Sequence, residues 1–396
     1  MKTPYFLIRE EILNKNIKDF QTALKTYWPN SQLAYSVKTN SLPWILEKMR
    51  KKKIMAEVVS EEEYQLVKKC LFSDEFILYN GPIKSTDSLN NAFKNKSIVN
   101  IDSLNELEQI KNHKFSFFSN IGIRLNVDSS IFDKNDVDYI EDGFRFGFSE
   151  ENGEFKKAVD VIKSCDANCK IGLHLHCNSI TRSRSVYKHI AEYAVKIIDK
   201  YNLFPSFIDM GGGFFGGVEG KPTADDYISD ITKVLSKSVD TKVTKLIIEP
   251  GSALIGSAVE FHTSVIDVKD TAHARIVTTD GSRVNIDPLW KKSRYMFSLN
   301  SENSEKFNQN YPRQIVCGYT CMDFDRIMVL ENGRELSVGD EIIYHRVGAY
   351  SVTFGGPFIR YFPDVYAEKC GKYELARSRI SVDDYYFIQS KKGQLK

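Results

Sequence analysis

Between residues 12 and 260, short apolar segments alternate with longer amphipathic ones, and this rhythm constrains the fold more than any other feature of the chain. Short apolar runs are typical of buried strands, whereas an apolar period of 3.6 residues is typical of helices. The expected strands are Gln32–Val37, Ile54–Val59, Phe76–Tyr79, Ser97–Asn100, Gly122–Val127, Lys170–His176, Phe207–Met210 and Lys245–Glu249. The expected helices are Glu11–Thr26, Pro43–Lys51, Glu61–Lys69, Ser103–Lys111, Phe155–Ser164, Ser185–Lys200 and Thr223–Ser238. This order predicts an α/β fold, a (β/α)8 barrel with its active site at the carboxyl ends of the strands.

After Ser252 the pattern changes to short strands separated by turns. The expected strands are Val259–Lys269, Ala274–Thr279, Gln314–Cys317, Ile327–Leu330, Glu341–Tyr344 and Tyr385–Gln389. Turns are expected at Thr279–Gly281 and Glu331–Gly333, and the N-terminal strand Tyr5–Ile8 is expected to join this sheet. The sequence therefore predicts a barrel domain over residues 12–260 and an all-β domain over residues 261–396 together with 1–11.

Composition excludes several classes of protein. The formal net charge of the 396 residues is +2, so no bulk attraction to nucleic acid or to an anionic membrane is expected. No apolar run approaches the ~20 residues of a membrane span, and the first ten residues do not have the pattern of a signal peptide. Seven cysteines, an odd number scattered through a long chain, argue against a disulfide framework. We expect a cytoplasmic protein without a metal site.

Lys38 ends an expected barrel strand and is followed by two small polar residues, Thr39 and Asn40. A lysine with its amine at the open end of a barrel is placed to form a Schiff base with a carbonyl compound. Taken alone, the residue fits a surface lysine with a buried stem equally well.

Three further features follow expected barrel strands. The run Gly211, Gly212 and Gly213 allows close approach of an anion to successive backbone N–H groups, although a flexible turn is the commoner meaning of such a run. Glu249, before a rigid Pro-Gly turn, is placed to accept a hydrogen bond from a protonated ring nitrogen, or to cap or pair elsewhere. His174 and His176 share one face of their strand, which suits a metal, ring stacking or a polar interior.

Together, a Schiff-base lysine, a glycine nest for one phosphate, a glutamate for a pyridinium and a stacking histidine predict pyridoxal 5'-phosphate as the cofactor.

At this point the chain resembles the barrel-type (fold type III) pyridoxal-phosphate-dependent decarboxylases, the group of ornithine, diaminopimelate and arginine decarboxylases. The resemblance covers nearly the whole chain. The matching segments in the barrel are Tyr35–Asn40, Glu57–Ser60, Phe144–Gly147, His174–Ser179, Gly211–Phe214 and Glu249–Gly251. It implies that Lys38 holds the cofactor, that His176 stacks on its ring, and that Glu249 binds its ring nitrogen. The remaining cofactor-binding residues that it implies in the barrel are Glu57, Ser179, Gly211, Gly212, Gly213 and Gly251.

In the β domain, Gly318–Asp325 resembles the cysteine motif of this family, and Gly348–Tyr350 resembles the motif whose tyrosine contacts the cofactor phosphate. The resemblance implies that Tyr350 binds the phosphate and that Phe358 lines the substrate site. It also implies a homodimer in which Cys321 enters the partner's active site and donates a proton.

Three positions depart from the family pattern. Met322 stands where relatives place an acid for the distal amine of the substrate, Ser252 stands where they usually have arginine, and Asn178 replaces a glycine. A thioether favours apolar or bulky groups over an ammonium. We therefore expect a modified or conjugated amino acid rather than ornithine or diaminopimelate as the substrate, with Asp323 in reach of an amine only if the loop shifts.

The function expected from the sequence is decarboxylation of such an amino acid through an external aldimine and a quinonoid. Two alternatives stay open at this point: an amino-acid racemase on the same fold, and a non-catalytic regulatory homologue.

Overall fold

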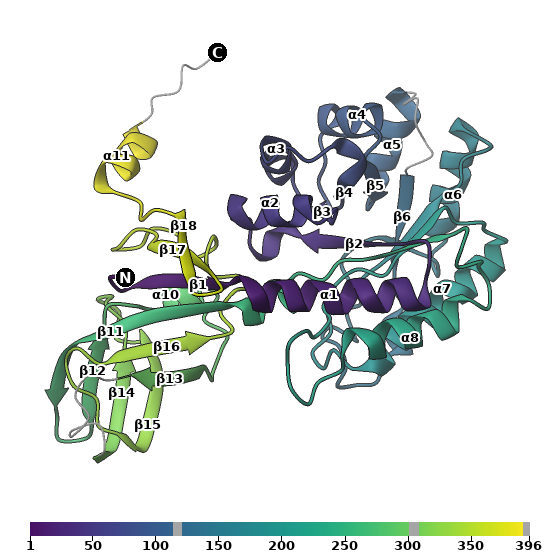
Figure 1. Cartoon of the computed structure of the whole chain (residues 1–396). Helices are drawn as coiled ribbons and strands as arrows, with labels where there is room; N and C mark the ends of the chain where they lie inside the picture. Colours follow the sequence, from purple (N-terminus) through teal and green to yellow (C-terminus); the bar gives the residue numbers. More distant parts are fainter. Residues whose placement is uncertain (114–120, 301–308, 391–396) are drawn as a thin grey trace. The chain divides into compact units, whose positions relative to one another are not determined.

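The computed structural model describes residues 1–113, 121–300 and 309–390 (Figure 1). The chain divides into two compact units: Lys15–Leu254 forms one, and Met1–Asn14 with Ile255–Lys396 forms the other. The domain boundaries expected from the sequence remain a prediction. No helix in the described ranges is long and apolar enough to cross a membrane.

Eight parallel strands form a closed barrel in the first unit. They are β2 (Ser31–Ser36), β3 (Met55–Val58), β4 (Ile77–Tyr79), β5 (Ile98–Ile101), β6 (Ile121–Asn126), β8 (Gly172–Leu175), β9 (Phe207–Asp209) and β10 (Lys245–Ile248). Strand β10 pairs with β2 and strand β5 with β6, so the sheet has no open edge. The two-residue strand β7 (Phe148–Ser149) adds to β6. Each strand confirms one of the eight expected from the sequence.

The longer barrel helices are α1 (Glu10–Tyr27), α2 (Pro43–Lys51), α3 (Glu61–Lys69), α4 (Thr86–Lys94), α5 (Leu104–His113), α6 (Glu154–Cys165), α7 (Arg184–Tyr201) and α8 (Ala224–Leu235). Helix α4 was not expected, because its run of aspartate, serine and asparagine has low helix propensity. It forms because Leu89, Ala92 and Phe93 are buried and because the Ser85 hydroxyl accepts the backbone N–H of Ser88. Tertiary packing therefore decides this helix.

An apolar layer fills the part of the barrel interior that lies toward the amino ends of the strands. Its members are Ala34, Met55, Leu78, Ile98, Phe207 and Ile247. Gly122 and Gly172 make room for the ring of Phe207, since a Cβ at position 172 would lie 2.2 Å from that ring. We call these eight residues, one on each strand, the floor.

The second unit is a nine-stranded, mostly antiparallel sheet. Its strands are β1 (Tyr5–Arg9), β11 (Val259–Asp270), β12 (Arg275–Thr279), β13 (Met296–Asn300), β14 (Asn310–Cys317), β15 (Arg326–Arg334), β16 (Glu341–His345), β17 (Asp364–Lys369) and β18 (Lys372–Arg377). The expected pairing of the N-terminal strand with this sheet is confirmed, since β1 lies between β11 and β17.

Two expectations for this unit are wrong. The expected strand Tyr385–Gln389 lies within helix α11 (Val382–Ser390), where Ser381 and Asp384 cap the first turn reciprocally. This cap outweighs the β propensity of the aromatic residues that follow it. The expected turn at Glu331–Gly333 lies inside β15, which accommodates Asn332 at a φ of 48°. Strands β13, β17 and β18 were not expected.

Candidate active site

A polar layer lies directly above the floor. Because side chains of a strand alternate between its two faces, the residue two positions after each floor residue points to the same interior. These residues are Ser36, Glu57, Asn80, Asn100, Arg124, His174, Asp209 and Glu249. All eight are buried. On every strand the side chains that face the interior thus change from apolar to polar over two residues. The change lies at the carboxyl end of the strands, where barrel enzymes place their chemistry.

Lys38 lies on the short 3-10 turn that follows β2, and its amine is bound to this layer. Its Nζ donates to Glu57 Oε2 at 2.8 Å, and the Ser36 hydroxyl donates to the same oxygen at 2.5 Å. Glu57 is 1% exposed, whereas 39% of the Lys38 side chain is exposed. The amine is therefore held in place by a buried carboxylate and is reachable from the barrel opening.

Asn80 and Asn100 connect the carboxylates of the layer. The amide of Asn80 donates to Glu57 at 3.2 Å and to Glu249 at 2.6 Å. The amide of Asn100 donates to Asn80 at 2.8 Å and to Asp209 at 3.1 Å. Neither asparagine was singled out from the sequence. Their position two residues after a floor residue is the signal that could have found them.

Glu249 shares its environment with a second buried acid. Ligand atoms of His174, Asp209 and Glu249 lie within 4.8 Å of one another. Burial raises the pKa of Asp209 to about 7. Burial, followed by the Asp209 and Glu57 carboxylates, raises the pKa of Glu249 well above its ordinary value. Two carboxyl groups that lie this close together and are buried away from water favour sharing one proton. Such a pair is suited to bind a basic ring nitrogen.

His176 is held neutral beside the glycine loop. Burial, followed by the charges of Arg124 and Lys38, lowers its pKa to about 3. Arg124 also donates to the carbonyl of His176 at 3.4 Å and pairs with Asp102 at 3.1 Å. A neutral imidazole fixed through its backbone is suited to stacking on an aromatic ring.

The glycine loop fits tightly around these side chains. Gly211 has a φ of 61°, and a Cβ there would lie 2.6 Å from Nδ1 of His176. A Cβ on Gly212 would lie 2.4 Å from the carbonyl oxygen of Glu249, and one on Gly251 would lie 2.0 Å from Oγ1 of Thr39. Larger residues would close this space. Glycine is therefore required for the loop to pass this close to its neighbours. The N–H of Gly211 donates to Asp209 at 3.0 Å, so an anion site here would use the N–H groups of Gly212 and Gly213.

Aromatic residues support the loop from behind. Tyr187 donates to the carbonyl of Gly212 at 3.1 Å, and its ring stacks on Phe214 at 4.4 Å between centroids. Ser179 lies on the neighbouring loop, where its hydroxyl donates to the carbonyl of Asp136 and accepts the backbone N–H of Arg182. The site fits pyridoxal phosphate, because it combines glycine N–H groups, a hydroxyl, a neutral histidine, a carboxyl pair and a lysine amine.

The remaining residues singled out from the sequence belong to the β unit, so their assembly with the barrel residues stays a prediction. Cys321 is an exposed free thiol. Asp323 is exposed beside it, and Met322 is partly buried. Tyr350 and Phe358 are 40% and 44% exposed.

Asp325, which the sequence did not single out, anchors this loop. Its carboxylate accepts hydrogen bonds from the hydroxyls of Ser282 and Thr320 at 2.8 and 2.6 Å. The residue itself is buried. The acid that ends the cysteine motif is therefore turned into its own loop, where it holds the loop in shape.

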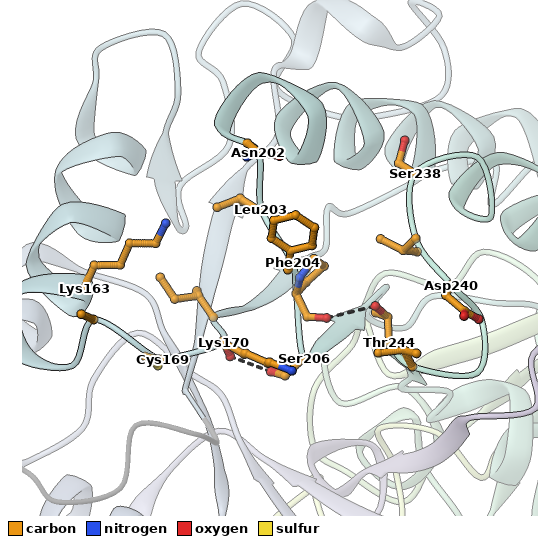
Figure 2. A pocket seen from close by; sticks show the side chains of 15 residues that line it. Lys163, Cys169, Lys170, Asn202, Leu203, Phe204, Ser206, Ser238, Asp240 and Thr244 are labelled. Atoms are coloured by element: carbon orange, nitrogen blue, oxygen red, sulfur yellow. Dashed lines mark hydrogen bonds between the residues drawn. The ribbon is translucent and has the colours of Figure 1, made fainter.

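A separate cavity of about 790 Å³ lies at the opposite end of the barrel strands (Figure 2). Its walls are residues that precede β8, β9 and β10, among them Lys170, Ser206 and Thr244, together with the exposed Phe204. Cys169 also lines it, and burial raises the pKa of this thiol to about 12, so it carries no thiolate. Barrel enzymes do not place their chemistry at the amino ends of the strands.

Comparison with known proteins agrees with the geometry. The sequence profile of the family "Pyridoxal-dependent decarboxylase, pyridoxal binding domain" matches residues 11–256. Diaminopimelate decarboxylase of Archaeoglobus fulgidus is 26% identical over 90% of this chain and 85% of its own length. The L-glutamyl-[BtrI acyl-carrier protein] decarboxylase of Niallia circulans is 24% identical over 98% of this chain and 94% of its own. The structure of diaminopimelate decarboxylase from Helicobacter pylori complexed with L-lysine has a TM-score of 0.81 at 22% identity, covering 98% of this chain and 97% of that one.

The chain belongs to the pyridoxal-dependent decarboxylases. It is a fold type III enzyme of the ornithine, diaminopimelate and arginine decarboxylase group, and its cofactor is pyridoxal 5'-phosphate. Its reaction is the decarboxylation of an amino acid.

Proposed function

We propose that this decarboxylase acts on an amino acid whose far end is acylated or conjugated to a carrier rather than on a free diamino acid. The observation that carries this is the chemistry of the Cys321 loop. Met322 offers a thioether at the position after the cysteine, and Asp325 is committed to Ser282 and Thr320. Within the loop 318–325, the acid left to meet a free ammonium is therefore the exposed Asp323.

The relative from Niallia circulans supports the conjugated class, because its name describes a glutamyl group carried on an acyl-carrier protein. The diaminopimelate decarboxylases among the relatives support the opposite choice. We favour the conjugate because of the composition of the Cys321 loop, where Met322 follows the cysteine and Asp325 is bound to Ser282 and Thr320.

We assign the barrel residues the following roles. Lys38 holds the cofactor aldehyde, and Glu57 orients the lysine amine through the 2.8 Å hydrogen bond. His176 stacks on the ring, while Gly211–Gly213, Ser179 and Gly251 surround the phosphate. When bound, the cofactor withdraws the electrons that remain at the α carbon after CO₂ leaves. Glu249 supports this by keeping a proton at the ring nitrogen.

The α carbon then needs a proton, and we assign this step to Cys321, an exposed thiol on a loop of the β unit. We further propose that the protein is a homodimer in which Cys321 acts across the subunit interface, and that Tyr350 contacts the cofactor phosphate. Mixing inactive Lys38→Ala and Cys321→Ala subunits is then expected to restore part of the activity, since one of the two mixed sites is intact. If dimers that contain one subunit of each variant form and stay inactive, the shared site is contradicted.

The substrate proposal is tested by measuring CO₂ release. The substrates are free ornithine, lysine, arginine and diaminopimelate, each compared with derivatives acylated at the distal amine, and glutamate compared with its carrier-linked form. Release from a derivative with little from the free diamines is the expected result. Rapid turnover of any free diamine overturns the proposal. The Met322→Glu variant serves as the matched control and is expected to gain activity on free diamines.

A further inference from the structure

The proposed phosphate site is built from neutral donors. The Gly211 N–H donates to Asp209 and the Ser179 hydroxyl donates to the carbonyl of Asp136, so the N–H groups of Gly212 and Gly213 are the donors that the glycine run offers to a phosphate. These N–H groups carry no formal charge, whereas a phosphate monoester carries about −1.5 to −2 at pH 7. Charge-assisted hydrogen bonds are about twice as strong as neutral ones. A cation close to these donors would therefore contribute strongly to binding the phosphate.

The chain segments that form this site contain two lysine or arginine side chains. Among residues 176–183, 210–223 and 249–251, these are Arg182 and Lys221. Both lie against the ring of Phe215, two residues after the glycine run, at 5.4 and 5.3 Å from its centroid. Segments far apart in the sequence thus bring two cations onto a single ring beside the glycine loop.

Neither cation forms an ion pair with a carboxylate within the part of the chain that the structure describes. Arg184, only two residues further, behaves differently and pairs with Asp226 and Asp230 at 3.1 and 2.6 Å. Arg184 is therefore used to join α7 to α8. The positive charge of Arg182 is not neutralised in this way.

The backbone of Arg182 is held in an uncommon conformation. Its φ is 51°, in the left-handed region that non-glycine residues seldom adopt. Its N–H donates to the hydroxyl of Ser179 at 2.9 Å, and its carbonyl accepts the Tyr227 hydroxyl at 2.6 Å. Strain of this kind persists where the surroundings fix it and is concentrated at functional sites. Here it couples Arg182 directly to the proposed phosphate ligand Ser179.

The charge of Arg182 also affects Tyr187, whose hydroxyl is bound to the glycine loop. The hydroxyl of Tyr187 donates to Gly212 and would lie 2.9 Å from a Cβ on Gly213. Burial raises the pKa of Tyr187 well above its ordinary value, and the positive charge of Arg182 opposes this rise. A group bound at the glycine N–H groups would therefore also experience this charge.

We propose that Arg182, assisted by Lys221, supplies the positive charge that binds the phosphate group of the cofactor. This inference rests on the proposed assignment of Gly211–Gly213 and Ser179 as the phosphate site. Relatives usually have an arginine after the Glu-Pro-Gly turn, where this chain has Ser252. The proposal places the positive charge for the phosphate on the loops after β8 and β9 instead.

The test compares pyridoxal 5'-phosphate with pyridoxal, which has the same aldehyde and ring but no phosphate. The dissociation constants of both for the apoenzyme are measured from the absorbance of the complex with Lys38, without any substrate. The ratio of the two constants isolates the contribution of the phosphate. Arg182→Gln is expected to lower this preference roughly tenfold, as for loss of one charged hydrogen bond. Lys221→Gln is expected to lower it less, and Arg182→Lys to retain most of it.

Arg184→Gln is the matched control, since it removes a neighbouring arginine whose charge is already paired. Its preference for pyridoxal 5'-phosphate over pyridoxal is expected to equal that of the wild type. If the wild type itself does not prefer the phosphorylated form, the assignment of the phosphate site is wrong. If the wild type prefers it and Arg182→Gln keeps the full preference, only the role of Arg182 is wrong. Equal weakening of both ligands in Arg182→Gln also overturns the inference, because the arginine would then act on the loop and not on the phosphate.

Discussion

The floor and the polar layer of the barrel are built on the same eight strands, two residues apart, yet they have opposite chemistry. Phe207 is packed between two glycines, while Asp209 on the same strand lies beside Glu249 and accepts a hydrogen bond from Asn100. The floor gains stability from apolar burial and close packing. The polar layer buries acids that would be more stable in water and holds them through amides and one lysine. The difference shows which residues stabilise the fold and which carry the chemistry.

The largest expected effect is in the polar region. Lys38→Ala removes the amine that binds the aldehyde, so we expect loss of the Schiff-base absorbance and at least a roughly thousandfold fall in CO₂ release. The variant also leaves the buried Glu57 carboxylate without its cation, so some loss of stability to urea is expected, and CO₂ release is compared at equal folded fraction. Retained Schiff-base absorbance in the purified variant would show that another residue holds the cofactor.

The matching change in the floor should affect stability. Phe207→Ala removes a ring that fills the space between Gly122 and Gly172, and we expect a loss of about 3–5 kcal/mol in the free energy of unfolding. Urea denaturation measures it. At low urea and low temperature the folded fraction should still bind the cofactor. A stable Phe207→Ala protein that fails to bind the cofactor would remove the distinction between the two layers.

Overpacking the floor gives a smaller effect on stability. A Cβ at Gly172 would lie 2.2 Å from the Phe207 ring, so Gly172→Ala is expected to cost about 1–3 kcal/mol. The double variant with Phe207→Leu should recover part of this loss, because the two positions are in contact. Additive effects in the double variant would indicate that the ring is not what the new methyl group meets.

The last comparison concerns pH. Burial raises the pKa of Asp209 from 3.8 to about 7 in the folded protein, so the folded state binds more protons than the unfolded state between these values. The contribution of this group to stability is therefore present at about pH 4 and is lost as the pH rises to about 7. The free energy of unfolding of the apoenzyme, measured across this pH range, should fall more steeply for the wild type than for Asp209→Asn. Parallel curves would mean that Asp209 is ionised in the folded protein.

Much of the architecture could be predicted from the sequence. Buried parallel strands are nearly continuous apolar runs, so all eight barrel strands were found, and seven helices followed from their apolar period. Helix α4 and helix α11 were not found. A local serine cap outweighs residue propensity in both helices, and in α4 buried side chains add to it; a propensity argument includes neither.

The sequence also singled out Lys38, Glu249 and the glycine run, because each stands at the end of an apolar run where a charge or a flexible turn is unusual. The resemblance to the family added Glu57 and the stacking role of His176. Asn80, Asn100, Asp209 and Arg182 carry no such signal by themselves. Their meaning depends on neighbours contributed by other strands and loops: Asn80 joins two acids, and Arg182 meets Phe215.

The sequence alone determined the alternation of strand and helix, the change to an all-β region and the residue types needed for one cofactor. These properties are local, because periodicity and turn chemistry act over a few residues. Only the tertiary structure decided which side chains share the barrel interior, which acids are left without water, and which cations are left without a carboxylate. Closing the barrel brings residues 169 positions apart into hydrogen-bond contact, as Asn80 and Glu249 are, and burial there sets the protonation of the acids.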